Sequence, residues 1–194
     1  MQLSDVFSDA LSCDESLNWS EFFGNDNPVE IEIGTGTGRF LSVEALNRPE
    51  VNFLGIEAAS TWARNAARRI LKKEIPNVKI LSSEAARFLR DCVPDESVAA
   101  VHIYFPDPWP KRRHAKRRLL CTDFVDDLVR ILISGGRIEF ATDIKGYFIH
   151  VQGLLDSRPE LRQRIGRGGA TRSGYAKKFL DVGRPIFQTS FEKR

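Results

Sequence analysis

The segment VEIEIGTGTGR, residues Val29 to Arg39, places a short apolar and acidic run directly before three glycines at alternate positions. The run predicts a strand over Val29 to Ile33, and glycines let the backbone turn tightly and approach a ligand closely. A helix predicted over Arg39 to Leu46 follows, and its first turn offers unpaired amides to a ligand. The segment therefore predicts a strand, turn and helix that bind a nucleotide or nucleoside, with a purely structural tight turn as the alternative.

The acidic residue before the glycines narrows the choice of ligand. The dinucleotide fingerprint G-x-G-x-x-G needs Gly or Ala where this chain has Arg39. Glu32 lies two residues before the first glycine, where a carboxylate would repel a pyrophosphate but attract a cation. S-adenosylmethionine carries an ammonium, a sulfonium and an adenosine, but no phosphate. We therefore expect S-adenosylmethionine to bind at Glu32, Gly34, Gly36 and Gly38.

Beyond this segment, short apolar runs alternate with amphipathic stretches. The further predicted strands are Asn52 to Glu57, Val78 to Leu81, Val98 to Phe105 and Arg137 to Thr142. The further predicted helices are Trp62 to Ile75 with Thr61 as N-cap, Glu84 to Cys92, Thr122 to Leu132 and Gly146 to Asp156. Strands that alternate with helices indicate an α/β fold with a mainly parallel sheet, which binds ligands at the carboxyl ends of its strands.

The length of 194 residues predicts one domain with a continuous core. Residues 1–27 are expected to form an irregular or helical lead-in, with Trp19, Phe22 and Phe23 packed on the sheet. No apolar run approaches the ~20 residues that cross a bilayer, and Met1 to Asp14 does not resemble a secretory signal. We therefore expect a cytoplasmic protein without a membrane segment.

The cysteines and histidines do not indicate a metal site. Three cysteines are widely spaced and form no C-x-x-C pair, and three histidines fall at no ligand spacing. We expect reduced cysteines and no metal.

Acidic residues follow the second and third predicted strands. Glu57 closes a strand about twenty residues beyond the glycines, where a carboxylate reaches ribose hydroxyls; a surface acid is the alternative. Ser82, Ser83 and Glu84 follow the next strand, and could hydrogen-bond adenine. Glu84 is equally plausible as an acid in the first turn of a helix, where the helix dipole favours it.

The fourth strand runs into the segment YFPDPWP, residues Tyr104 to Pro110, which is followed at once by KRRHAKRR. Pro106 and Pro108 fix their own φ angles and restrict the residues before them, so Asp107 is held on a stiff turn. Rigidity is what a group that positions a substrate requires. In the alternative interpretation the prolines only end the strand and Trp109 fills a gap in the core.

Positive charge is confined to two blocks of the chain. Residues 111–118 contain six Lys and Arg and no acid, and residues 158–194 contain ten Lys and Arg against three Asp and Glu. Residues 1–110, by contrast, contain ten cations against seventeen acids. An acidic body with two basic patches indicates a polyanionic partner, although an isolated basic run is commonly a solvated loop. Beside the Asp107 turn, the basic run favours a nucleic acid.

These motifs together resemble the tRNA (guanine-N7)-methyltransferase family, a class I group that depends on S-adenosylmethionine. The resemblance spans about Trp19 to Asp143 and is carried by residues 29–39, 53–57, 104–119 and 135–143, with D-P-W-P-K-x-R-H-x-K-R-R-L as its most specific part. It implies a Rossmann-like fold with a mainly parallel seven-stranded sheet and helices on both faces. Within one domain, it implies a cofactor-binding core at 28–157 and terminal strands with a basic, substrate-facing segment at 158–194.

The resemblance also implies roles for particular residues. Glu32, Glu57, Glu84 and Asp107 fall on cofactor-contacting positions, and Asp107 on the catalytic position; Glu84 stands where the family usually has Asp. The resemblance places Lys111 and Asp143 on positions that bind the tRNA substrate. The charge of the basic run itself predicts that phosphates are held by Lys111, Arg112, Arg113, Lys116, Arg117 and Arg118. The implied reaction is methylation of guanine N7 in the variable loop of tRNA, with no obligate protein partner.

The C-terminal part departs from the family. The family usually carries a T-x-x-E element there, but neither Thr171 nor Ser173 is followed three residues later by Glu. A carboxylate implied to help hold the target guanine is therefore missing. Two alternatives stay open: a methyltransferase acting on another RNA or on an exocyclic amine, and a non-catalytic RNA-binding protein of the same fold.

Overall fold

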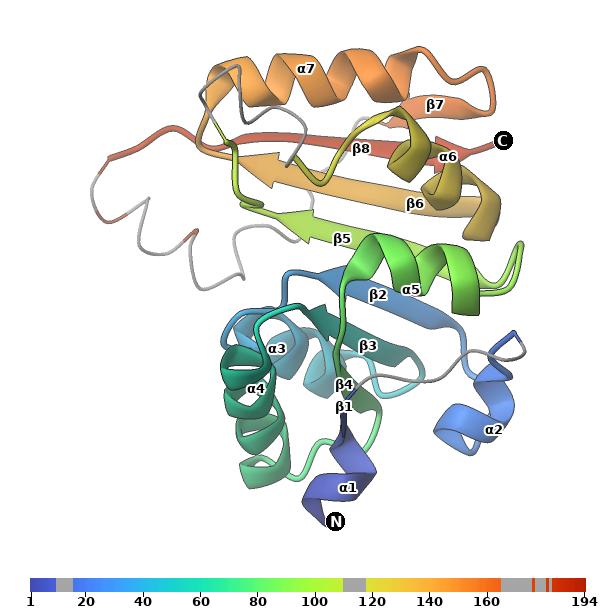
Figure 1. The fold of residues 1–194 in the computed structure, drawn as a ribbon, viewed down its shortest axis with the longest axis vertical. Coiled ribbons are helices and arrows are strands. Elements are labelled where there is room, and N and C mark those ends of the chain that lie inside the picture. Colours follow the sequence, from blue (N-terminus) through green and yellow to red (C-terminus); the bar gives the residue numbers. More distant parts are fainter. Residues whose placement is uncertain (10–15, 110–117, 165–175, 177–180, 182) are drawn as a thin grey trace.

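The computed structural model describes residues 1–9, 16–109, 118–164, 176, 181 and 183–194. Figure 1 shows strands and helices alternating along most of the chain. The helices are α1 (Leu3–Val6), α2 (Trp19–Phe23), α3 (Arg39–Asn47), α4 (Ser60–Lys72), α5 (Ala85–Cys92), α6 (Thr122–Ile131) and α7 (Lys145–Asp156). The strands are β1 (Phe7–Asp9), β2 (Val29–Ile33), β3 (Asn52–Glu57), β4 (Val78–Ser82), β5 (Val98–Tyr104), β6 (Leu132–Thr142), β7 (Leu161–Arg164) and β8 (Phe187–Lys193).

The described strands form one sheet in the order β1-β4-β3-β2-β5-β6-β8-β7. Neighbours from β1 to β6 pair in parallel, whereas β8 pairs antiparallel with both β6 and β7. The predicted mainly parallel α/β sheet is confirmed, but it has eight described strands rather than seven, because β1 of the lead-in adds an edge strand beside β4. The strand order reverses between β2 and β5, so a ligand is expected where these strands end.

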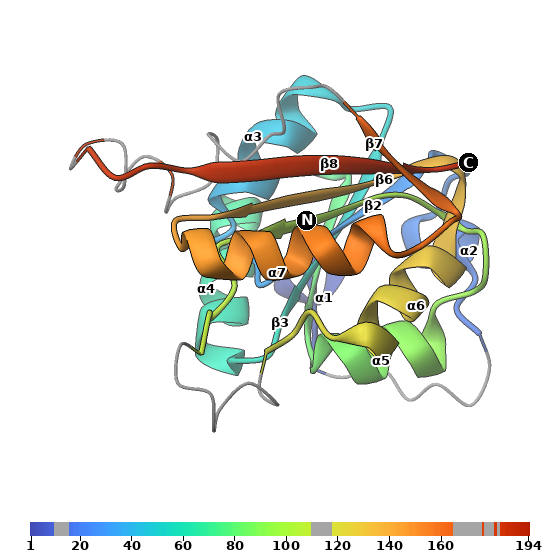
Figure 2. The same ribbon diagram turned by 90° about the horizontal axis from the view of Figure 1, so that it is seen from above.

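Helices cover both faces of the sheet. One hydrophobic core contains residues of α5, α6 and α7, and the other contains residues of α1, α3 and α4. Figure 2 shows α7 and α3 on opposite sides of the strands. Trp19, Phe22 and Phe23 of α2 pack against the first of these cores, and Trp19 Nε1 donates to Ser97 Oγ at 3.0 Å. The predicted packing of the lead-in on the sheet is confirmed for these aromatic residues.

Several predicted boundaries were wrong, each for a local reason. The helix predicted to end at Ile75 ends at Lys72, because Glu74 has φ 53° and the proline after Ile75 disfavours helix there. Its N-cap is Ala59 rather than Thr61. The strand predicted to reach Phe105 stops one residue earlier, since Phe105 has φ 54°.

The predicted chemistry of the cysteines also needs correction. Cys92 is disulfide-bonded, so the expectation of three reduced cysteines is wrong at this position, while Cys121 is free and exposed. Cys13 lies outside the described residues. No helix in the described part of the chain is long and apolar enough to span a bilayer.

Candidate cofactor site

A pocket of about 470 Å³ lies where β2, β3, β4 and β5 end. Its volume is in the range of sites for small ligands. The residues that line it are Ile33, Gly34, Ile56, Glu57, Ala58, Ala59, Trp62, Ser83, Glu84, Ala85, Tyr104, Phe105, Pro106, Asp107, Trp109 and Leu119. The structure therefore brings Gly34, Glu57, Glu84 and Asp107 together around one cavity, as the sequence predicts.

The glycine turn forms one wall of this pocket. Gly34 has φ 77°, which a residue with a side chain rarely adopts, and a Cβ on it would meet no atom within 4 Å. Its backbone thus faces open space that a ligand can use. Gly38 has φ 68°, and a Cβ on it would lie 3.0 Å from Ala66 Cβ. Gly38 is needed so that α3 can pack closely against α4.

The carboxylate of Glu57 fixes the turn and faces the pocket. Its Oε2 accepts from the Gly36 amide at 2.9 Å, and its Oε1 accepts from the Ala59 amide at 3.1 Å. A carboxylate has about four acceptor positions, so each oxygen can still accept a ligand hydroxyl. The position of Glu57 is therefore compatible with the predicted ribose contact.

Glu32 is buried and is not among the residues that line the pocket, although Ile33 and Gly34, which follow it in the chain, are. Only 4% of the residue is exposed, and within the described part of the chain its Oε2 has no hydrogen-bond partner. Burial raises the pKa of Glu32 well above its usual value of 4.5, and the charges of Glu57 and Glu44 add to the effect. A buried, unpartnered carboxyl beside a ligand pocket is costly for the free protein and suited to a cation. This orphan oxygen and the open space over Gly34 both fit S-adenosylmethionine.

Replacing Glu32 with Gln should stabilise the free protein and weaken cofactor binding. A raised folded pKa means that the stability contributed by Glu32 is full below pH 4.5 and is lost as the pH rises towards the folded pKa. Gln cannot ionise, so the melting temperature of Glu32→Gln should exceed that of the native protein by a margin that grows from pH 5 to pH 8. Loss of a charged hydrogen bond should weaken S-adenosylhomocysteine binding about 10- to 150-fold.

Thermal melts at both pH values and titration calorimetry test this prediction together. Glu160→Gln is the control, because Glu160 is exposed and outside the pocket. Equal affinity of the native protein and Glu32→Gln would contradict the assignment of Glu32 to the cofactor.

Glu84 and Trp62 lie on two other parts of the rim. Glu84 is the exposed N-cap of α5, but its side chain makes no capping hydrogen bond. The structure thus leaves its carboxylate available to a ligand, as the predicted adenine contact requires. Trp62 is in the first turn of α4 and is 50% exposed. Sequence reasoning missed Trp62, although its place five residues after Glu57 could have pointed to the pocket.

Asp107 is exposed on a turn with an unusual backbone. Phe105 and Trp109, two residues to either side, have φ 54° and 39°. For bulky residues such angles are outliers that cost about 1–3 kcal/mol each and occur mainly at functional sites. The guanidinium of Arg118 donates to the carbonyls of Pro108 at 3.0 Å and Trp109 at 3.4 Å. The predicted turn is therefore present, and hydrogen bonds from Arg118 to two of its carbonyls hold it in place.

The predicted tRNA-binding residues are only partly described. Lys111, Arg112, Arg113, Lys116 and Arg117 lie outside the described residues. Arg118, which is predicted to hold a phosphate, donates to the carbonyl of Pro108 in the Asp107 turn and lies over the ring of Tyr147 at 5.5 Å.

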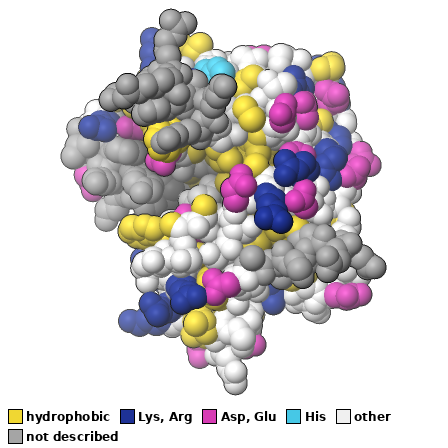
Figure 3. Space-filling view, viewed as in Figure 1, with side chains coloured by type: hydrophobic (Ala, Val, Ile, Leu, Met, Phe, Trp, Pro, Cys, Tyr) yellow, Lys and Arg dark blue, Asp and Glu magenta, His cyan; other side chains and the backbone are white. Residues whose placement is uncertain are grey.

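Asp143 follows β6 but does not line the pocket. Its Oδ2 accepts from Arg184 Nη1 at 3.2 Å. On the face shown in Figure 3, described cations are interspersed with acids instead of forming one positive patch.

Solved structures show which class of protein this fold and pocket define. An S-adenosylmethionine-dependent methyltransferase from Aquifex aeolicus superposes with a TM-score of 0.62 at 15% identity, covering 90% of this chain and 87% of that one. A 30S ribosomal A1408 methyltransferase from an uncultured bacterium gives 0.61 at 19% identity, covering 90% and 91%. The fold is that of the class I methyltransferases.

Sequence comparison identifies the family within that class. Residues 26–177 match a family model described as "Putative methyltransferase". The tRNA (guanine-N(7)-)-methyltransferase of Geobacter metallireducens is 36% identical, over 91% of this chain and 87% of the relative. That of Bacillus licheniformis is 38% identical, over 91% and 85%. The chain belongs to the tRNA (guanine-N7)-methyltransferase family, whose members are S-adenosylmethionine-dependent enzymes.

Proposed function

We propose that the protein transfers a methyl group from S-adenosylmethionine to N7 of a guanine in the variable loop of tRNA, forming 7-methylguanosine. The observation that carries the proposal is Asp107, held on a strained turn at the rim of a pocket that also presents the glycine turn, Glu57 and Glu84. Relatives that share more than a third of their residues with this chain bear the name of this activity.

The cofactor, when bound, supplies an electrophilic methyl group on its sulfonium. Glu57 accepts hydrogen bonds from ribose hydroxyls, Glu84 accepts one from the adenine amine, and Glu32 offers a carboxylate to the ammonium. The glycine turn lets the ligand approach the backbone. These contacts hold the methyl group near Asp107, so binding also provides the orientation on which the rate depends.

Asp107 acts on the acceptor base. Guanine N7 carries a lone pair in the ring plane and has no proton to lose, so the reaction needs no strong base. Positive charge develops on the purine as the methyl group arrives, and a fixed carboxylate offsets it. We therefore assign Asp107 to orientation of the base and stabilisation of this charge, not to proton abstraction.

The RNA must present an accessible guanine. In an A-form helix N7 lies in the deep, narrow major groove, out of reach of side chains, so the target is in a loop or is flipped out. The basic run at 111–118 directly follows the Asp107 turn and supplies the charge to hold phosphates nearby. Lys111, Arg112, Arg113, Lys116 and Arg117 are assigned to these contacts, and Asp143 to the substrate. A tRNA substrate implies a cytoplasmic location.

Incubation with labelled S-adenosylmethionine and unmodified tRNA, followed by nucleoside analysis, tests the proposal. We expect 7-methylguanosine as the product, which would also show that the family's T-x-x-E glutamate is dispensable here. A nucleoside methylated on an exocyclic amine would identify a different reaction. Binding of cofactor and tRNA without any product would identify a non-catalytic RNA-binding protein.

The position of Trp62 leads to a prediction about cofactor affinity. A half-exposed indole on the rim, close in sequence to Glu57, is placed to stack on the adenine ring. Stacking of a base on an aromatic ring contributes about 1–3 kcal/mol, so Trp62→Ala should weaken S-adenosylhomocysteine binding about 5- to 150-fold, and Trp62→Phe much less. Calorimetry measures both, with Trp19→Phe as the control, since Trp19 of α2 packs against the core that contains residues of α5, α6 and α7 and does not line the pocket. Unchanged affinity in Trp62→Ala would remove the indole from the site.

A further inference from the structure

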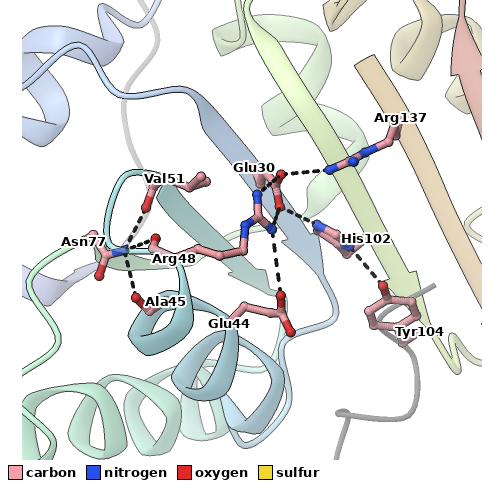
Figure 4. A network of polar contacts seen from close by, with 9 residues as sticks. All are labelled: Glu30, Glu44, Ala45, Arg48, Val51, Asn77, His102, Tyr104 and Arg137. Carbon is pink, nitrogen blue, oxygen red and sulfur yellow. Dashed lines mark hydrogen bonds and ion pairs between the residues drawn. The ribbon is translucent and has the colours of Figure 1, made fainter. Parts of the chain in front are cut away.

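A buried ionic network lies between the end of α3 and the sheet, and Tyr104 joins it to the lining of the pocket. Its centre is Glu30 of β2, which is 2% exposed. Arg48 donates to both Glu30 oxygens, at 2.9 and 2.5 Å, and Arg137 of β6 donates to Oε1 at 3.2 Å. His102 of β5 lies with Nε2 2.9 Å from Glu30 Oε2. Figure 4 shows these side chains converging on Glu30 of β2 from β5, β6 and the end of α3.

His102 joins this network to the pocket wall. Its Nδ1 lies 3.0 Å from the hydroxyl of Tyr104, two residues along β5. A carboxylate only accepts, so His102 Nε2 carries the proton that Glu30 receives. His102 Nδ1 is hydrogen-bonded to the Tyr104 hydroxyl, as acceptor in a neutral ring and as donor in a charged one. A continuous chain of hydrogen bonds thus joins Tyr104 through His102 to Glu30.

Tyr104 contacts both the ionic network and the pocket. Its hydroxyl end points into the network, and its ring packs edge-on against Phe40 with the centroids 5.0 Å apart. The same residue also lines the pocket. Burial raises the pKa of Tyr104 well above its usual value of 10, so the hydroxyl keeps its proton and remains a donor. The hydroxyl of Tyr104 is therefore held by His102, and its ring is held by Phe40.

The residue after Tyr104 begins the strained turn that carries Asp107. Phe105 has φ 54°, and its amide donates to the Ala141 carbonyl at 2.7 Å. Strained backbone persists only where the surroundings over-determine it. Arg118 holds the far end of the turn. At the near end the Phe105 side chain packs against the core that contains residues of α1, α3 and α4, and the Tyr104 hydroxyl is hydrogen-bonded to His102.

We infer that His102 and Tyr104 are positioning residues for methyl transfer: the hydrogen bond between Tyr104 and His102, anchored on Glu30, fixes the direction in which the turn presents Asp107. This inference rests on the role proposed for Asp107. Neither residue is assigned to bind the reacting atoms. Both should act on the rate of the bound complex rather than on its affinity for cofactor.

Two conservative variants isolate this link. Tyr104→Phe keeps the ring but removes the hydroxyl. In His102→Gln the side-chain amide can still donate to Glu30 from the place of Nε2, while nothing replaces Nδ1 as hydrogen-bond partner of Tyr104. A displacement of a catalytic group by about 1 Å can cost about 100-fold in rate, so each variant should lose about 10- to 100-fold in kcat. The KM for S-adenosylmethionine should change less than twofold.

A variant of a nearby buried polar residue controls for stability. Asn77 is 8% exposed and donates to the carbonyls of Ala45, Arg48 and Val51, at the end of α3 away from the pocket lining. Asn77→Ala should lower the melting temperature at least as much as Tyr104→Phe. Its kcat should equal that of the native protein at a temperature where all variants are folded.

The experiment measures kcat and KM for Tyr104→Phe, His102→Gln, their double variant, Asn77→Ala and Asp107→Asn with unmodified tRNA. We expect the double variant to be no slower than either single variant, because both break the same link. A kcat for Tyr104→Phe within twofold of the native value, or losses that multiply in the double variant, would overturn the inference. If Asp107→Asn is itself fully active, the proposed role of Asp107 fails, and this inference fails with it.

Discussion

Asp107→Asn is expected to lower kcat by about 100- to 1,000-fold while tRNA affinity stays within twofold of the native value. Removal of one preorganised group that stabilises developing charge has an effect of this size in other enzymes. Asn keeps the size of the side chain and a carbonyl oxygen but loses the negative charge. Because Asp107 is exposed and the proline turn does not depend on its carboxylate, the fold should be unaffected.

Single-turnover methylation and a tRNA-binding titration separate the two quantities. Asp156→Asn is the control, because Asp156 ends α7, is exposed and lies outside the pocket. Asp107→Asn with a rate within threefold of the native enzyme would remove Asp107 from the mechanism. A parallel loss of tRNA affinity would assign it to substrate binding instead.

Glu30→Gln is expected to lower the free energy of unfolding by about 3–5 kcal/mol at neutral pH. The change leaves Arg48, Arg137 and His102 without the buried charge that they surround. Burial raises the pKa of Glu30, but hydrogen bonds from His102 and Arg48 outweigh that effect and lower the pKa from 4.5 to about 2. A loss of this size is a large part of the stability of an ordinary domain.

The pH dependence of Glu30→Gln follows from the lowered pKa. A depressed folded pKa gives stability that is present above pH 4.5 and is lost as the pH falls from 4.5 towards 2. The difference between the native protein and the variant should therefore be largest above pH 5 and should shrink as the pH falls. Denaturant unfolding at pH 7, 4 and 3 measures it, with Glu160→Gln as the control. A difference that stays constant over this range would show that Glu30 is not ionised in the folded protein.

Much of the site was predictable because each strand end carried its own chemical signal. The glycines after β2, Glu57 at the end of β3 and the prolines around Asp107 have local meanings that hold in a parallel sheet. Because these strands are parallel, their carboxyl ends lie at the same edge of the sheet. The motifs therefore come together in space, although no motif indicates by itself which other motif it will meet. The short apolar run also predicted both bounds of β3, Asn52 and Glu57, correctly.

Features that depend on long-range packing were not predicted. The Glu30 network joins residues up to 107 positions apart, and in the sequence His102 is only a histidine in an apolar strand. The hydrogen bonds from the Arg118 guanidinium to the carbonyls of Pro108 and Trp109 in the Asp107 turn were not predicted either. Strand β1 was missed because it has only three residues, FSD, of which Phe7 favours a strand and Asp9 disfavours one, and because its pairing comes only from β4.

A crystal structure of the protein with S-adenosylhomocysteine tests the central claim most directly. We predict the ligand in the pocket at the ends of β2 to β5, with its ribose hydroxyls on Glu57, its adenine beside Trp62 and Glu84, and its ammonium drawn to Glu32 behind the glycine turn. The sulfur should face Asp107. A ligand bound elsewhere, or bound in this pocket with its sulfur turned away from the Asp107 turn, would contradict the account.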